Sequence, residues 1–114
     1  MKYSMFIGRW QPWHKGHRWL INQRLNENKN VLICIREVDT NDKNPYDPNE
    51  VKKNIESQLK DLIDSGKVRV IIIPDIESVN YGRGVGYDII EHIPPDNVGK
   101  ISATEIRKKL FSKK

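Results

Sequence analysis

The chain has 114 residues and a mass of 13.4 kDa, which is enough for one compact domain with a single hydrophobic core and small for two. Hydrophobic residues make up 37% of the sequence, so the composition is that of a folded protein rather than a disordered chain. The net charge of +5 favours a polyanionic partner, either nucleic acid or a small phosphorylated molecule. No apolar run reaches the roughly 18 residues of a membrane-spanning helix and no signal peptide is recognisable. We therefore expect a soluble, cytoplasmic protein with one domain over residues 1–114.

The first third of the chain predicts a strand, a helix and a second strand. Residues 3–7 form a short, mostly apolar run that Gly8 stops, which suits a buried strand. From Gly16 onward, apolar residues recur at helical spacing and place His17 in the first turn of an amphipathic helix. Residues 31–35 are β-branched or aliphatic, as in a central parallel strand, and the single cysteine within them is expected to be a buried thiol.

The middle of the chain predicts a helix followed by a third strand. Asp47 is the expected helix cap, with Pro48 at the first helical position. The apolar stripe of this helix continues to Gly66, where a single long helix is expected to end. Residues 68–73 form the third strand, which a proline closes.

The last third predicts a short fourth strand over residues 87–93 and a final helix from Ala103 to Phe111, capped by Ser102. The whole pattern has a βαβαβ rhythm, which predicts an α/β fold with a Rossmann-like, doubly wound parallel sheet and right-handed crossovers. Because a small sheet leaves an edge exposed, a homo-oligomer is also expected.

The residues suited to chemistry lie where the first strand meets the first helix, in the run Gly8-Arg9-Trp10-Gln11-Pro12-Trp13-His14-Lys15-Gly16-His17. Parallel α/β sheets bind ligands at the carboxyl ends of their strands. Glycines allow backbone N–H groups to approach phosphate, and a helix N-terminus supplies positive potential. His14 and His17 are three residues apart on the first turn and point the same way. The run therefore predicts an anion site.

Three other interpretations of this run deserve comparison. A zinc site at the two histidines would need further ligands, and only His92 and scattered carboxylates remain. Trp10 and Trp13 are expected to wall the core, with stacking on a nucleotide base as the alternative. Neither a GxGxxG run after a first strand nor a GxxxxGK[ST] run occurs, which disfavours dinucleotide oxidoreductases and P-loop kinases.

The run from Gly8 to His17 resembles the G-R-F-Q-P-F-H-x-G-H form of the HxGH signature of the cytidylyltransferase-like nucleotidyltransferase superfamily. Ile101-Ser102-Ala103-Thr104-Glu105-Ile106-Arg107 is similar to the second signature of that superfamily, I-S-x-T-x-I-R. Within the superfamily, residues 44–50 and 72–80 are most similar to nicotinamide-mononucleotide adenylyltransferases. The resemblance implies transfer of AMP from ATP to a small phosphate monoester such as nicotinamide mononucleotide, with release of pyrophosphate.

The resemblance also implies the residues of the site. Contacts to the nucleoside triphosphate are implied for Gly8, Arg9, Trp10, His14, Gly16, His17, Ser102, Thr104 and Arg107. Among these, the resemblance implies that two histidines and one arginine stabilise charge on the phosphates as catalytic residues, namely His14, His17 and Arg107. Mg²⁺ is the expected cofactor, bridging phosphate oxygens. The loop after the third strand lies at the same sheet edge and is expected to bind the acceptor, through Asp75, Asn80, Tyr81 and Arg83.

The sequence departs from the adenylyltransferase pattern in three places. Tyr81-Gly82-Arg83 stands where that family has a tryptophan near the nicotinamide ring, which leaves the identity of the acceptor open. Glu50-Val51 stands where Glu-Arg is expected, so Lys52 or Lys53 is the candidate substitute for the basic group. The segment before the second signature is short, as in glycerol-3-phosphate cytidylyltransferase. Transfer of CMP from CTP to a phospho-alcohol therefore stays open as an alternative. From another class of protein, a non-catalytic module that binds nucleotides or nucleic acid stays open too, with nucleic acid the less expected partner.

Overall fold

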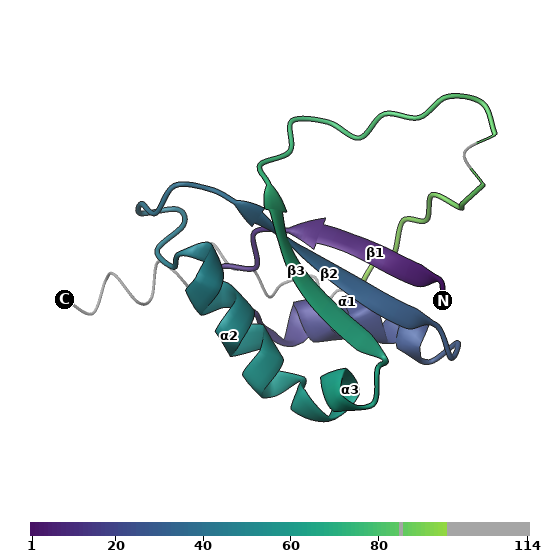
Figure 1. The fold of residues 1–114 in the computed structure, drawn as a ribbon, viewed down its shortest axis with the longest axis horizontal. Helices are drawn as coiled ribbons and strands as arrows, with labels where there is room; N and C mark the ends of the chain where they lie inside the picture. Colours follow the sequence, from purple (N-terminus) through teal and green to yellow (C-terminus); the bar gives the residue numbers. More distant parts are fainter. Residues whose placement is uncertain (85, 96–114) are drawn as a thin grey trace.

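The computed structural model describes residues 1–84 and 86–95, which form a parallel sheet with helices between its strands (Figure 1). Along the chain the elements are β1 (Tyr3–Gly8), α1 (Lys15–Leu25), β2 (Asn30–Glu37), α2 (Pro48–Gln58), α3 (Lys60–Asp64) and β3 (Val68–Pro74). The strand order is β1-β2-β3, and both pairs of neighbours are parallel. The predicted α/β, Rossmann-like fold is confirmed.

The core lies on one face of the central strand β2. Val31, Ile33 and Ile35 alternate along β2, share that face and are fully buried. They belong to one cluster with Ile21 of α1 and Ile55 of α2. Both crossover helices cover the same face, as two right-handed crossovers in the same direction require. A helical layer on the opposite face, which a doubly wound sheet has, is not found within residues 1–84 and 86–95.

The opposite face of the sheet is also apolar. Cys34 lies on this face at 1% exposure, which confirms its predicted core position, and burial raises the pKa of its thiol. Met5 of β1 lies on the same face, because the register pairs it with Leu32, yet it is 57% exposed. The outer edge of this face, along β1, is therefore open to solvent.

The predicted single helix between Asp47 and Gly66 is interrupted. Asp47 caps α2 through hydrogen bonds from the backbone N–H groups of Asn49 and Glu50, as expected. The helix ends at Leu59, whose backbone (φ −112°, ψ 22°) leaves the helical region, and α3 begins at the next residue. Leu59 is buried in the core, as Val51 and Ile55 of α2 are. The expectation of one continuous helix was wrong at this position.

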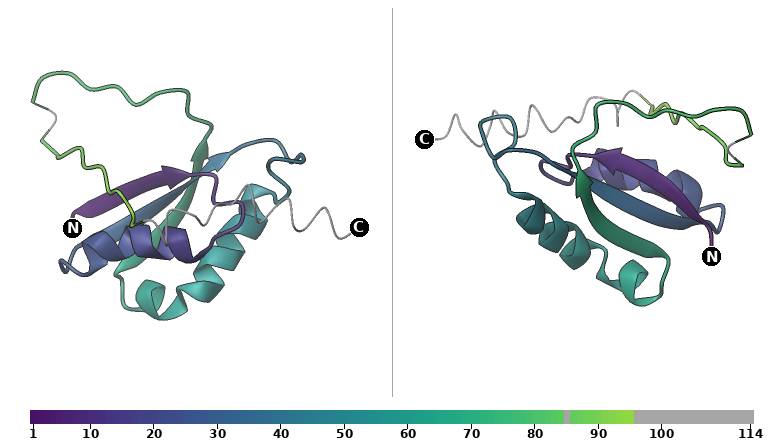
Figure 2. Two further views of the ribbon diagram at one scale, coloured as in Figure 1. Left: turned by 180° about the vertical axis from the view of Figure 1, so that it is seen from behind. Right: turned by 45° about the horizontal axis from the view of Figure 1, so that its top comes forward.

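The predicted fourth strand over residues 87–93 was also wrong. Residues 86–95 form no strand: the segment after β3 arches away from the sheet and returns towards β1 (Figures 1 and 2). A strand requires a hydrogen-bonded neighbour, and this segment pairs with none of the three strands. Its apolar side chains are mostly exposed, as Ile89 and Ile93 show, and the prolines at 94 and 95 have no N–H group to donate.

Several predictions concern the end of the chain. The helix from Ala103 to Phe111 and the residues Ser102, Thr104 and Arg107 lie outside the described residues. Within the described ranges, no helix has the length and apolar character needed to cross a membrane.

Candidate active site

The loop between β1 and α1 is shaped by the packing of Trp10 on Gly8. Trp10 has a positive φ of 55°, which folds its indole back over the end of β1. A Cβ atom at Gly8 would lie only 2.9 Å from Cε2 of that indole, so any other residue would displace the ring. The indole Nε1 donates a hydrogen bond to the carbonyl oxygen of Cys34 at 3.1 Å. Gly8 is thus required for the packing of Trp10. The sequence had suggested a different reason for this glycine, the approach of backbone N–H groups to phosphate.

Two tryptophans form the wall behind the histidines. Trp10 and Trp13 are 5% and 6% exposed, which confirms that they belong to the core. The ring of His17 lies edge-on to Trp10, with centroids 4.8 Å apart, and tilted against Trp13 at 5.4 Å. A direct contact between Trp10 and a nucleotide remains a prediction. In the structure, the buried indole of Trp10 packs against the ring of His17.

His14 and His17 cap α1 with their own side chains. His14 is the N-cap, and its Nδ1 accepts a hydrogen bond from the backbone N–H of Gly16 at 3.0 Å. Nδ1 of His17 accepts one from the backbone N–H of His14 at 3.2 Å. The two imidazole rings stack, with centroids 3.7 Å apart and planes 21° from parallel. The backbone therefore fixes the position of both rings at the helix N-terminus.

These hydrogen bonds determine which ring nitrogen carries the proton. In a neutral imidazole one nitrogen donates and the other accepts. Because Nδ1 accepts in both His14 and His17, the proton of each neutral ring must be on Nε2. Neither Nε2 atom has a hydrogen-bond partner within residues 1–84 and 86–95. Every buried side-chain nitrogen or oxygen in those residues has a partner, so a ring nitrogen without one is not buried. Both Nε2 atoms are therefore accessible. The pair presents two N–H donors beside a helix N-terminus.

The environment keeps both rings neutral. Burial lowers the pKa of His14 below its ordinary value. Burial, together with repulsion from His14, lowers the pKa of His17 to about 3. At neutral pH both rings are therefore uncharged, and the positive potential at this point comes from the N–H dipoles and the helix N-terminus.

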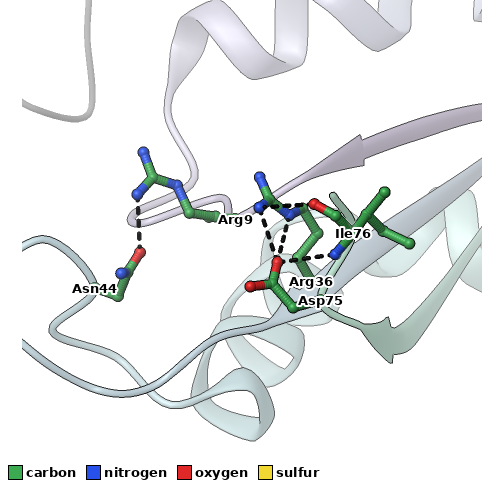
Figure 3. A network of polar contacts seen from close by, with 5 residues as sticks. All are labelled: Arg9, Arg36, Asn44, Asp75 and Ile76. Carbon is green, nitrogen blue, oxygen red and sulfur yellow. Dashed lines mark hydrogen bonds and ion pairs between the residues drawn. The ribbon is translucent and has the colours of Figure 1, made fainter. Parts of the chain in front are cut away.

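A second loop is attached to this one by buried polar contacts that the sequence did not predict. Gln11 is 2% exposed; its Nε2 donates to the carbonyl oxygen of Tyr46 at 2.7 Å and its Oε1 accepts from the N–H of Tyr46 at 3.0 Å. Beside it, Nη1 of Arg9 donates to Oδ1 of the buried Asn44 at 3.3 Å (Figure 3). Each pair is 35 residues apart in sequence, so no local pattern could have revealed it.

The residues predicted to bind the acceptor are not gathered at one point. Asp75 follows β3 directly and forms an ion pair with Arg36 of β2 (Figure 3). Asn80 donates to the hydroxyl of Ser78, and Tyr81 and Arg83 lie exposed further along the same segment. Lys52 and Lys53 lie on α2, the first half-buried and the second exposed.

Two cavities lie among the described residues, and only the smaller one adjoins the loop between β1 and α1. The smaller cavity, of about 430 Å³, lies between α2 and the loop that joins β1 to α1, which we call the motif loop. It is lined by Trp10, Pro12, Trp13, Tyr46, Glu50, Val51, Asn54 and Gln58. The larger, about 660 Å³, follows the free edge of β1 and the segment that returns to it, where Phe6 stacks on His92. Among the described residues, no group of three or more histidines, cysteines or carboxylates could hold a metal ion.

Comparison with known proteins adds one relative. A nicotinamide-nucleotide adenylyltransferase of Caldivirga maquilingensis is 32% identical over 78 residues, which are 66% of this chain and 44% of the relative. The chain thus matches less than half the length of that protein. No model of a protein family matches the chain. The similarity relates the chain to the nucleotidyltransferases, in agreement with its α/β fold.

Proposed function

We propose that the chain is a nucleotidyltransferase that transfers AMP from ATP to a small phosphate monoester such as nicotinamide mononucleotide, releasing pyrophosphate. The observation that carries the proposal is the stacked pair of His14 and His17, which presents two accessible N–H donors at the N-terminus of α1. That position, at the carboxyl edge of a parallel sheet, is where α/β proteins bind phosphates. The similarity to an adenylyltransferase favours ATP as the donor.

The chemistry requires no nucleophilic side chain. An oxygen of the acceptor phosphate attacks the α-phosphorus of ATP in line, the bond from that phosphorus to the bridging oxygen breaks, and pyrophosphate leaves with the electron pair. Charge develops on the oxygens around the α-phosphorus, where fixed donors stabilise it. The Nε2–H groups of His14 and His17 are donors that residues 1–84 and 86–95 offer, and the caps on α1 orient them before substrate arrives.

Magnesium enters this proposal with the substrate. Because the described residues hold no cluster able to cage a metal ion, Mg²⁺ would come bound to the triphosphate of ATP. The ion would supply positive charge that neutralises part of the charge on the phosphates, as it does in phosphoryl transfer generally.

A pyrophosphate-release assay tests the proposal. The protein is incubated with Mg²⁺, with ATP or CTP, and with nicotinamide mononucleotide, glycerol 3-phosphate or choline phosphate in turn. We expect release with ATP and nicotinamide mononucleotide, dependent on both. Release only with CTP would replace adenylyl by cytidylyl transfer, and no release with any pair would favour a binding module. In that case, binding to a polynucleotide that weakens steeply with salt would identify nucleic acid as its partner.

A further inference from the structure

A second cationic group lies at the carboxyl edge of the sheet, apart from the histidines. Arg36 is the penultimate residue of β2, and the register pairs Gly8 with Ile35, so β1 and β2 leave the sheet side by side at this point. The side chain of Arg9 turns to Asn44, whereas that of Arg36 turns to Asp75 at the end of β3 (Figure 3). Arg36 therefore lies between the motif loop and the segment where the acceptor is expected.

The contacts of Arg36 occupy one side of its guanidinium group. Nε and Nη2 donate to the same oxygen of Asp75, Oδ1, at 2.9 and 2.8 Å, and Nη2 also donates to the carbonyl oxygen of Ile76 at 3.2 Å. Oδ1 of Asp75 accepts in addition from the backbone N–H of Ile76 at 2.9 Å. Nη1 has no partner within residues 1–84 and 86–95, and because the guanidinium is planar, the direction of its two N–H groups is fixed.

Stability does not account for this arrangement. The Arg36 and Asp75 side chains are 31% and 55% exposed. An ion pair with that exposure contributes about 0–1 kcal/mol to the free energy of unfolding. An arginine with one side anchored and the other accessible is, however, suited to bind a phosphate, whose oxygens match its N–H groups. Asp75 lies on the anchored side, away from Nη1, so it opposes an incoming anion less than a carboxylate beside Nη1 would.

The position of Arg36 is distinct from the anion site at α1. Its side chain shares the face of Cys34, two residues earlier on β2, and that is the face that α1 and α2 leave uncovered. A phosphate held by Nη1 would therefore lie on the other side of the sheet edge from α1. Nucleotidyl transfer brings together phosphates from two substrates, so a second phosphate position is a requirement of the proposed reaction.

We propose that Arg36 binds a phosphate group of a substrate at this edge, and that Asp75 is a positioning residue that orients Arg36 rather than a ligand of the acceptor. The inference rests on the proposed function. The phosphate comes either from ATP or from the acceptor.

Binding measured by calorimetry separates these possibilities. ATP with Mg²⁺ and nicotinamide mononucleotide are titrated separately into the wild-type protein and into Arg36→Met and Arg36→Lys. The matched control is Arg69→Met, which removes the same charge from β3 at a position paired with Leu32, further from the carboxyl edge. We expect Arg36→Met to weaken one ligand by about tenfold or more, since hydrogen bonds to charged groups are strong. Arg36→Lys should weaken it less, and Arg69→Met should have little effect.

The ligand that is weakened identifies the source of the phosphate. Loss of ATP affinity assigns it to the triphosphate, loss of nicotinamide mononucleotide affinity assigns it to the acceptor, and loss of both supports a position that either phosphate can occupy. If both ligands bind Arg36→Met as they bind Arg69→Met, the inference is wrong and the proposed function stands. If the wild-type protein binds neither ligand, the proposed function fails and the inference fails with it.

A double-mutant cycle tests the role of Asp75. Asp75→Ala should weaken the same ligand in the wild-type background, because Arg36 loses its anchor, and should change nothing further in Arg36→Met. Equal losses in both backgrounds would show that Asp75 contacts the ligand itself, which would overturn its role as a positioning residue. Melting curves report whether each variant folds. If Arg36→Met does not fold, the charge-conserving Arg36→Lys decides, since only a phosphate contact predicts a loss of affinity there.

Discussion

His14 and His17 each use one ring nitrogen for structure and leave the other for a ligand. Replacing His17 with alanine removes one N–H donor, together with the acceptor for the N–H of His14. We expect turnover to fall by about two to three orders of magnitude, the typical effect of losing one oriented donor. The measurement is the rate of pyrophosphate release at saturating substrate.

The matched control for this substitution is His92→Ala. His92 is the third histidine of the chain and stacks on Phe6, with ring centroids 6.2 Å apart, outside the stacked pair. Its replacement should leave turnover within about twofold of the wild-type value if the donors of the stacked pair carry the chemistry. Wild-type turnover in His17→Ala would refute the role assigned to His17.

The lowered pKa of His17 predicts that stability depends on pH. The unfolded chain takes up a proton at this ring near its ordinary pKa of about 6.5, whereas the folded chain does so only near pH 3. Between these values the unfolded state binds more protons, so the free energy of unfolding decreases as the pH falls from about 6.5 towards 3. Urea denaturation at pH 7 and at pH 4.5 measures the loss, which should be smaller in His17→Ala. An equal loss in both proteins would contradict the assignment to this ring.

The close contact between Gly8 and Trp10 predicts that a larger residue at position 8 lowers stability. Gly8→Ala places a methyl group 2.9 Å from the indole of Trp10, which is held by its hydrogen bond to Cys34. We expect a loss of about 1–3 kcal/mol in the free energy of unfolding, the usual cost of overpacking. Gly82→Ala is the control, because a Cβ there meets nothing within 4 Å. Denaturant midpoints compare the two, and equal midpoints would show that the indole moves without cost.

At the level of elements, Gln11 joins the motif loop to the loop before α2. Gln11→Ala leaves the N–H and carbonyl groups of Tyr46 without their partner, in a buried setting. We expect a cost of about 1–3 kcal/mol in the free energy of unfolding. Gln58→Ala, which removes an exposed contact to Asn54, should cost less than about 0.5 kcal/mol. Similar denaturant midpoints for both variants would mean that the contact to Tyr46 does not fasten the loops.

The elements that the sequence predicted correctly are those with strong local signals. The aliphatic runs of β2 and β3 and the cap at Asp47 need no information from distant residues. The predictions that failed depend on such information. Residues 87–93 have strand-like composition, but a strand exists only with a neighbour, and nothing in the apolar stripe around Leu59 indicates that the helix is interrupted there. An exposed edge of a small sheet was predictable, but that β1 forms such an edge follows from the strand order, which depends on contacts between distant residues.

The same distinction separates the parts of the candidate site. His14 and His17 were predictable because strand, loop and helix follow one another within a short run. Arg36 was not, because its partner is 39 residues further along and meets it only through the parallel pairing of β2 with β3. Asp75 lies at the carboxyl edge of the sheet, as expected, and its assignment to the acceptor stays a prediction; its ion pair with Arg36 was not foreseen.

At the scale of the whole molecule, the charge of +5 should act on any phosphorylated ligand. We expect the Kd for ATP to rise several-fold between about 0.05 and 0.5 M NaCl, as salt screens the attraction between charges. Adenosine, which has no phosphate, should bind with an affinity that barely changes. Equal salt dependence for both ligands would show that the positive charge of the protein has no part in recognising phosphate.

The hydrogen bonds of the stacked histidines have a consequence for how this chain can change over time. The Nδ1 atoms that orient the donors are the same atoms that cap the first turn of α1, so the helix start and the position of the donors depend on the same hydrogen bonds. A substitution that improves the helix start with an ordinary serine or aspartate cap would remove a donor. Selection for stability and selection for the proposed activity therefore act on the same two positions, where a better helix cap removes a donor.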